Sequence, residues 1–274
     1  MAVRLVVIGG GNMAGAIIRG ALDAAVLAPS EVVVCDPDTS KHPAFAALNV
    51  FATPSHAQAL RSLTDAAQLL LGVKPQMLGA VADQLRAHWP AHEPVVISIL
   101  AGTPSAKVRA AFGDAARVVR AMPNMAAGVR HSTTALCLGA GARPDDDAFA
   151  ERLFHAIGPL VVRADESMMD AFTAVAGSGP AYLFYLAEAM TAAAVDLGFD
   201  APTADRMVRE TLAGAATLLS ASPDPPATLR ASVTSKRGTT EAAIGVMDAH
   251  AVKEAIIEAL KRAQARGAEL ARGA

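Results

Sequence analysis

The sequence is poor in the residues that mark several common classes of protein. Only two cysteines occur in 274 residues, which predicts buried, reduced thiols and no disulfide framework, as is typical of a cytoplasmic protein. No group of cysteine and histidine residues has the spacing of metal ligands, so we expect no metal. The net charge is only −2. Without a basic patch we expect neither nucleic acid nor an anionic membrane as a partner.

Segments that would enter a membrane or direct export are also missing. The longest charge-free stretch in the apolar middle of the chain, residues 171–187, is interrupted by Gly-Ser-Gly-Pro at 177–180. It therefore predicts no membrane span. The apolar run at the N-terminus is short and contains Arg4, so we expect no signal peptide and nothing ahead of the first strand.

The first twenty residues carry the most informative motif. An apolar run, Leu5–Ile8, predicts a buried strand, and residues 9–14 after it match G-x-G-x-x-G/A before a helical pattern begins. Gly9 suits the tight turn from strand to helix, and Gly11 has no side chain to keep a pyrophosphate away from the backbone. Free N–H groups at the helix start would receive the anion. The motif in this context predicts a dinucleotide site.

Strands and helices alternate through the first part of the chain and then the strands stop. The helical patterns are Ala14–Ala24, Ser55–Leu63, Met77–Trp89, Thr103–Phe112 and Asp145–Ile157. The strand-like runs are Leu5–Ile8, Val32–Cys35, Leu69–Val73, Val95–Ile99, Val118–Ala121, Thr134–Leu138 and Leu160–Val162. This order predicts an α/β fold, a Rossmann-type doubly wound and largely parallel sheet over residues 1–164. Residues 165–274 read as helix after helix and predict an all-α domain, with a rigid joint at residues 223–226.

The helical part is rich in small residues on more than one helix face, as at residues 192–194 and 213–216. A unit of about 110 residues has little room to cover all these faces by itself, and close packing against a second copy would cover them. We therefore expect a homo-oligomer, a dimer or a multiple of dimers.

Three polar positions follow predicted strands at the edge where open α/β sheets bind ligands. Asp36 could accept hydrogen bonds from an adenosine ribose, or it could serve only the turn Asp-Pro-Asp at 36–38. Lys74 could contact a cofactor or be a solvated loop charge. Asn124 is the one polar side chain of a third such loop, residues 122–124. The sequence alone leaves these alternatives open.

In the helical part, residues 233–241 form a loop dense in hydroxyl groups that leads into a helix. The first N–H groups of that helix, with the hydroxyls of Ser235, Thr239 and Thr240, would make a nest for a carboxylate. A structural N-cap would need only one of these hydroxyls, and this interpretation also stands on spacing alone.

Lysine is absent between Lys107 and Lys236, and residues 165–274 contain a single histidine, His250. An enzyme that oxidises an alcohol needs a base for the hydroxyl proton. Reduction of a protonated imine needs only hydride, because the nitrogen already carries its proton. The gap favours imine reduction.

Together these residues resemble the pyrroline-5-carboxylate reductase family almost from end to end. The matching pieces are residues 8–13, 73–75, 101–102, 177–182 and the tract 229–242, which looks like the family signature V-x-S-P-G-G-T-T. The resemblance implies a dinucleotide-binding domain followed by a helical dimerisation domain. It also implies hydride transfer from NADPH or NADH to the C=N carbon of 1-pyrroline-5-carboxylate, which gives proline.

The resemblance assigns roles to individual residues. Thr240 would be catalytic, with its hydroxyl near the ring nitrogen of the substrate. Substrate-binding residues would be Ser235, Gly238, Thr239 and Thr240. Cofactor-binding residues would be Ile8, Gly9, Gly10, Gly11, Asn12, Met13, Cys35, Asp36, Pro37, Gly72, Val73, Lys74, Pro75, Ile99, Leu100 and Ala101.

The sequence departs from the family pattern at two places. Lys236-Arg237 replaces the Pro-Gly of the signature, and a side chain at a usual glycine position implies a positive φ or a tighter loop. Alternatively, either residue would add positive charge for a carboxylate. His56 is the counterpart of an asparagine that in the family touches the ribose phosphate.

Other readings of the same residues remain. A β-hydroxyacid dehydrogenase shares the two-domain layout, but it uses a lysine in the region where this chain has none. A non-catalytic NAD(P)-binding regulator would not need the loop at 235–240.

The sequence also leaves the choice between NADPH and NADH open: the family mostly takes NADPH, whereas the charge of Asp36 opposes a 2′-phosphate. We therefore expect NADH to be used at least comparably, and Asp36→Ser to lower the KM for NADPH.

Overall fold

The computed structural model describes residues 2–272 and divides the chain into two compact units. The first contains the chain up to Ser178 together with the stretch from Ala263 onward, and the second is Gly179–Arg262. The last strand ends at Arg163, and only helices and loops follow among the described residues. The predicted division at 164/165 coincides with this end of the strands and, as a domain boundary, stays a prediction.

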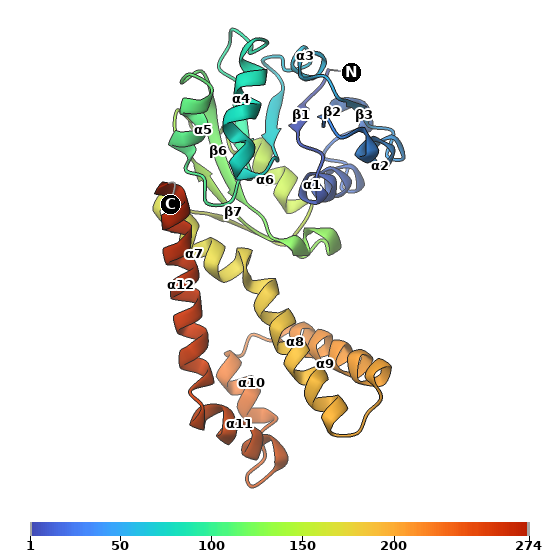
Figure 1. The fold of residues 1–274 in the computed structure, drawn as a ribbon, viewed down its shortest axis with the longest axis vertical. Helices are drawn as coiled ribbons and strands as arrows, with labels where there is room; N and C mark the ends of the chain where they lie inside the picture. The colour runs from blue at the N-terminus through green and yellow to red at the C-terminus, as the bar shows by residue number, and fades with distance from the viewer. Residues whose placement is uncertain (1, 273–274) are drawn as a thin grey trace. The chain divides into compact units, whose positions relative to one another are not determined.

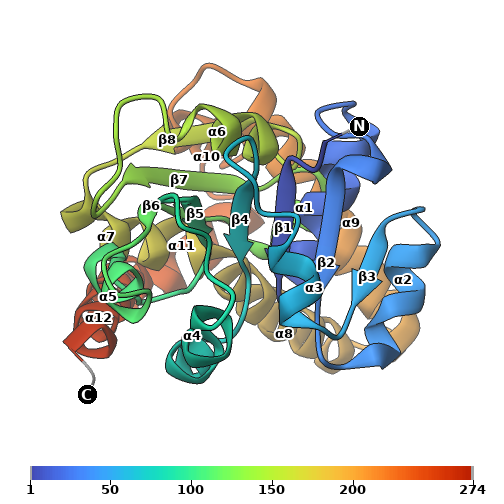
Figure 2. The same cartoon turned by 90° about the horizontal axis from the view of Figure 1, so that it is seen from above.

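The first unit is built on one eight-stranded sheet in the order β3-β2-β1-β4-β5-β6-β7-β8 (Figure 2). All neighbours are parallel except β6 and β7. The first six strands have the 3-2-1-4-5-6 order of a doubly wound dinucleotide-binding fold, which confirms the predicted fold class. The strands are β1 (Leu5–Ile8), β2 (Val32–Cys35), β3 (Phe51–Thr53), β4 (Gln68–Leu71), β5 (Val95–Ser98), β6 (Arg117–Met122), β7 (Thr133–Leu138) and β8 (Leu160–Arg163).

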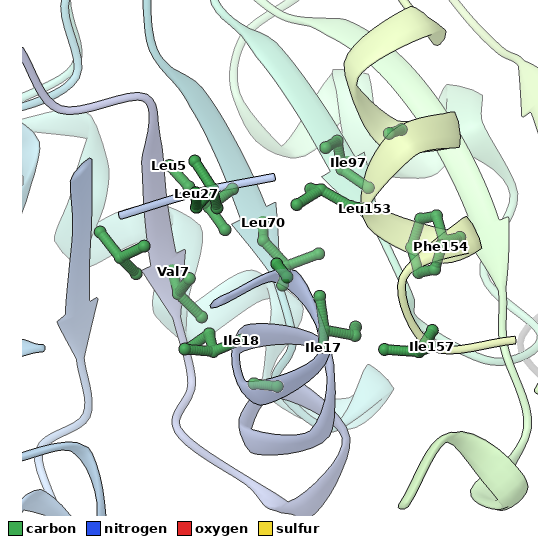
Figure 3. Close-up of a cluster of buried hydrophobic side chains, with 14 of the residues drawn as sticks. Leu5, Val7, Ile17, Ile18, Leu27, Leu70, Ile97, Leu153, Phe154 and Ile157 are labelled. Carbon is green, nitrogen blue, oxygen red and sulfur yellow. The ribbon is translucent and has the colours of Figure 1, made fainter. Parts of the chain in front are cut away.

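The strands β1 and β2 are apolar at every position because helices cover both faces of the sheet. Leu5 and Val7 of β1 belong to one buried cluster, whereas Val6 and Ile8 belong to another on the opposite face. The first cluster holds side chains of α1 and α6, shown in Figure 3. The second holds side chains of α3, α4 and α5. The α/β helices are α1 (Asn12–Asp23), α2 (His42–Ala46), α3 (His56–Leu60), α4 (Leu78–Arg86), α5 (Ser105–Ala111) and α6 (Ala148–His155).

Three elements have no counterpart among the sequence predictions. The strand β3 and the helix α2 are three and five residues long, too short for a periodic pattern to stand out. The third is α10, which begins at the last residue of the predicted joint: Pro225 is its N-cap and Pro226 its first residue. Proline fits there because the first turn of a helix needs no N–H from it.

The remaining helices include one local change of winding. The chain from Met169 begins as α-helix, but Thr173–Gly177 is π-helical. Two helices of the second unit, α8 and α9, pack against each other, and the last turns of α12 belong to the first unit. These helices are α7 (Met169–Phe172), α8 (Gly179–Asp196), α9 (Ala201–Ala221), α10 (Pro226–Ser232), α11 (Thr239–Ala249) and α12 (Val252–Arg272) (Figure 1).

The second unit buries few of its own residues. Between Gly179 and Arg262 only Ala194, Ala204 and Val208 are buried. Many large apolar side chains are exposed, such as Tyr185 at 76% and Leu197 at 81%. Within residues 2–272 no helix is long and apolar enough to cross a membrane.

A buried arginine anchors the segment that leads out of the sheet. Arg120 of β6 lies 2.8 Å from Glu166 and 3.8 Å from Asp170. The Glu166 carboxylate also accepts hydrogen bonds from the N–H and hydroxyl of Ser105. Burial would raise the pKa of Glu166, but these hydrogen bonds from Ser105 and Arg120 hold it below its ordinary value. The segment between β8 and α7 is thus held on the sheet by a charge network.

Candidate functional site

A cavity of about 750 Å³ lies at the carboxyl ends of the central strands. These strands lie on either side of the point where the strand order reverses, between β1 and β4, which is where open α/β sheets bind ligands. The cavity is lined by Ile8, Gly9, Gly11, Asn12, Met13, Cys35, Asp36, Pro37, Lys41, His56, Gly72, Val73, Lys74, Pro75, Met77, Ala80, Val81, Gln84, Ile99, Ala101, Met122 and Pro123.

Most of the predicted cofactor residues lie in this lining, and two do not. Gly10 is buried behind the turn, and the Leu100 side chain points into the core with 1% exposure. The structure thus brings the glycine motif, the end of β2 and the loops after β4 and β5 together around one cavity. Their roles as ligand contacts stay predictions.

The turn after β1 can be made only by glycine. Gly9 has a φ of +97°, and a Cβ on it would lie 2.8 Å from the carbonyl oxygen of Gly72. Its N–H donates to the Cys35 carbonyl at the end of β2. Gly9 therefore fixes where β1 ends relative to both of its neighbours.

Gly11 is free of such constraints from the protein. A Cβ on it would meet no atom within 4 Å, and its φ of −75° suits any residue. It is the N-cap of α1, which has no side-chain cap, so the first N–H groups of the helix are available to an anion. A residue without a side chain, next to a cavity and a helix start, fits the pyrophosphate of a dinucleotide.

The carboxylate of Asp36 is turned toward the glycine motif. It is 5% exposed and accepts hydrogen bonds from Gly10 N–H at 2.7 Å, Asp38 N–H at 2.9 Å and Lys41 Nζ at 2.9 Å. Burial would raise the pKa of Asp36, but these three donors outweigh it and hold the pKa below its ordinary value. Asp36 serves the turn, as one of the two sequence interpretations has it, and also braces the motif itself.

Sequence reasoning missed Lys41, which neutralises Asp36 at the cavity. It also missed the face of α4 and the turn before it. The residues concerned, Met77, Ala80, Val81 and Gln84, recur at three- and four-residue spacing, and this helical periodicity is a signal that could have found them. Lys41 has no such signal, because only the folded turn brings it to Asp36.

Two further titratable groups belong to the cavity. His56, the departure from the family's asparagine, lines it, and burial together with the nearby His88 lowers the pKa of His56. Cys35 is free and buried. Its pKa is raised to about 11, mainly by burial and to a smaller extent by the negative charge of Asp36. Cys137 is likewise free and buried. The prediction that both thiols are buried is confirmed.

The hydroxyl-rich loop of the second unit ends where α11 begins, as predicted. Gly238 is the N-cap and provides no side-chain cap, so the N–H groups of Thr239, Thr240 and Glu241 start the helix uncapped. Thr240 is half-buried, whereas Ser235 and Thr239 are exposed. The arrangement is suited to holding a carboxylate, as proposed for these residues from the sequence.

The departure at Lys236-Arg237 has a definite backbone consequence. The N–H of Gly238 donates to the Ser235 carbonyl at 3.0 Å and closes a turn, and its third residue, Arg237, has a φ of +62°. Type II turns have this pattern, with proline favoured at the second position and glycine at the third. Arg237 thus occupies a glycine conformation, which confirms the first of the two sequence expectations.

Known proteins match this chain over nearly its whole length. Residues 166–270 match the family described as pyrroline-5-carboxylate reductase dimerisation, and residues 4–102 match NADP oxidoreductase coenzyme F420-dependent. Pyrroline-5-carboxylate reductase of Pseudomonas aeruginosa is 38% identical over 271 residues, covering 98% of this chain and 97% of that protein. The chain belongs to the pyrroline-5-carboxylate reductase family.

Other relatives span the chain equally well. The Synechocystis pyrroline-5-carboxylate reductase is 36% identical over 98% of this chain and 99% of its own. The solved structure of the Coxiella burnetii pyrroline-5-carboxylate reductase has a TM-score of 0.86, with 33% identity over 98% of this chain and 99% of that one. The fold of the chain is thus that of the family.

Substitution of Gly9 should affect folding, whereas substitution of Gly11 should affect ligand binding. We expect Gly9→Ala to lower the thermal midpoint, because its Cβ would strike Gly72 and its φ is strained for alanine. We expect Gly11→Ala to keep the wild-type midpoint but to weaken NAD(P)H binding about tenfold or more, since a methyl group would occupy the pyrophosphate position. Thermal melts and coenzyme fluorescence titration of both variants measure this. Wild-type affinity in Gly11→Ala would show that the pyrophosphate lies elsewhere.

Proposed function

We propose that this protein is an NAD(P)H-dependent imine reductase that converts 1-pyrroline-5-carboxylate to L-proline, the last step of proline biosynthesis. The observation that carries the proposal is the similarity to reductases of this name over 98% of the chain. The cavity at the switch point of the sheet supports the proposal as a place for the coenzyme, and the uncapped start of α11 supports it as a place for the substrate carboxylate.

The residues of the cavity fit a nicotinamide dinucleotide. The α1 N-terminus and Gly11 would hold the pyrophosphate, and Cys35, Asp36 and Pro37 would surround the adenosine ribose. Gly72 to Pro75 and Ile99 to Ala101 would line the nicotinamide side. The reduced nicotinamide supplies the hydride.

The substrate residues belong to the loop before α11. The N–H groups of Gly238 and Thr239 would bind the carboxylate, and the Thr240 hydroxyl would orient the iminium nitrogen. A hydroxyl suffices because the protonated imine gains only a hydride at carbon, and the nitrogen keeps its proton. This role asks for no strong base, in keeping with the lysine-free stretch between Lys107 and Lys236.

Two alternatives have distinct signatures. A β-hydroxyacid dehydrogenase-like enzyme would oxidise an alcohol with NAD(P)⁺ and would need the lysine that this chain lacks. A non-catalytic NAD(P)-binding regulator would bind coenzyme and reduce nothing.

We further propose a cytoplasmic location, which suits buried, reduced thiols, and a role of residues 165–274 in dimerisation.

The function is tested by following NADPH and NADH consumption with 1-pyrroline-5-carboxylate. We expect oxidation of coenzyme that depends on the substrate and formation of proline. Coenzyme binding without such oxidation would favour the regulator, and alcohol-dependent reduction of NAD(P)⁺ would favour the dehydrogenase.

Thr240→Val should impair the reaction and leave coenzyme binding intact. A hydrogen bond to a charged group contributes about 1.5–3 kcal/mol, so kcat/KM should fall about 10- to 100-fold. Thr240→Ser keeps the hydroxyl and should retain most of the activity. Steady-state kinetics and NAD(P)H titration of both variants check this. Wild-type kcat/KM in folded Thr240→Val would remove the hydroxyl from the mechanism.

Lys41 should affect the two coenzymes differently. Lys41→Met leaves the Asp36 carboxylate without its counter-charge at the cavity, so a 2′-phosphate there would meet an uncompensated negative charge. An interaction of about 1 kcal/mol at a solvated site raises the KM for NADPH roughly fivefold, and the KM for NADH should stay unchanged. Lys107→Met, an exposed change of equal charge on α5, is the control. Equal effects on both coenzymes would place the 2′-position away from this pair.

The exposed apolar residues of the second unit predict self-association. Light scattering at micromolar concentration should give at least twice the mass of one chain, because the unit leaves large side chains such as Tyr185 uncovered. A fully active monomer at that concentration would contradict the dimer.

A further inference from the structure

One backbone carbonyl near the end of the first unit has lost its helical donor. In an α-helix the carbonyl of Ala176 would accept a hydrogen bond from the N–H of residue 180. Residue 180 is proline, which has no N–H. The chain is π-helical at this point, and the N–H of Ser178 donates five residues back to the Thr173 carbonyl at 2.8 Å. The Ala176 carbonyl needs a donor from elsewhere.

Asn124 supplies that donor from the loop after β6. Its Nδ2 donates to the Ala176 carbonyl at 3.0 Å. The side chain is only 9% exposed, and its Oδ1 accepts a hydrogen bond from Ala126 N–H at 3.1 Å. Its own N–H donates to the fully buried Ser132 hydroxyl at 3.1 Å. Because Oδ1 faces an N–H and Nδ2 faces a carbonyl, the amide has one orientation that satisfies both ends.

The same loop forms an edge of the cavity. Met122 and Pro123, directly before Asn124, line it together with Ile99 and Ala101 on the proposed nicotinamide side. Met122 also lies against the π-helical segment, since a Cβ on Gly177 would come within 2.9 Å of its Cε. One end of β6 therefore contacts both the cavity and the last turn before α8.

We propose that Asn124 is a positioning residue for hydride transfer. Its amide locks the cavity edge at Met122-Pro123 to the π-helical segment through which the chain passes into α8. Arg120, two residues before Met122, holds Glu166 in the stretch that leads to the π-helical segment, so β6 and the loop after it hold residues 166–176 at two points. The inference rests on the proposed function, because it concerns the placing of groups for that reaction. Misplacement by about 1 Å slows a reaction by as much as 100-fold.

Two variants remove the donor and keep an oxygen that can accept from Ala126 N–H. Asn124→Asp preserves the shape of the side chain, and Asn124→Ser is uncharged and too short to reach Ala176. In both we expect kcat with 1-pyrroline-5-carboxylate to fall about 10- to 100-fold. The dissociation constant of NAD(P)H should stay within about twofold, because its proposed contacts at the glycine motif are untouched. Hydrogen exchange in the peptide covering residues 173–178 should become faster. This measurement does not depend on the enzymatic activity of the protein.

A second substitution separates two roles of Asn124: positioning the cavity edge, and donating a hydrogen bond to the Ala176 carbonyl. Pro180→Ala restores the N–H that an α-helix would give to Ala176. Asn124→Ser should lower the thermal midpoint, because it leaves the Ala176 carbonyl without its donor; in Asn124→Ser/Pro180→Ala we expect the midpoint to recover and kcat to stay low. Recovery of both would show that any donor suffices and would overturn the proposal, as would wild-type kcat in either single Asn124 variant. Failure of the wild-type protein to reduce the substrate would instead refute the proposed function, and unchanged hydrogen exchange would refute the contact itself.

Discussion

The cavity depends on one close approach between backbones, that of Gly9 to Gly72. Strands β1 and β4 are neighbours at the point where the strand order reverses, and Gly72 N–H donates to the Ile8 carbonyl just before the turn. The two loops can diverge from so close a contact because Gly9 has no side chain, since a Cβ on it would lie 2.8 Å from the Gly72 carbonyl oxygen. The divergence opens the crevice and aims the start of α1 into it. Asp36 holds the same turn from β2 through Gly10, so three strands define the position of the motif.

The sequence predicts the elements whose patterns are long or fully apolar. The runs at β1, β2 and β5 stand out because both faces of those strands are buried, and the glycine pattern indicates the site because its spacing follows from the turn geometry. The strand β3 escapes prediction because its three residues include the exposed Phe51. The helix α10 escapes because proline is ordinarily read as a break and here begins the helix.

The sequence pattern does not predict the direction in which a side chain points. Asp36 has the position of a ribose acceptor, yet its carboxylate is turned to Gly10 and Lys41. Leu100 lies between two lining residues and points the other way, into the core. Asn124 was visible as a polar group at the right edge of the sheet, but its partner Ala176 is 52 residues away. Such pairings depend on the folded backbone, and no local period encodes them.

The sparse burial in the second unit has a consequence for how the protein gains its stability. A helical unit with three small or medium side chains in its interior removes little apolar surface from water by its own folding. The surface that remains is covered only when another molecule meets it, and that encounter is bimolecular. Folding and association then become one equilibrium, so the free energy of unfolding rises with the concentration of the chain itself. The sheet domain has no such dependence, because both of its apolar faces are covered from within.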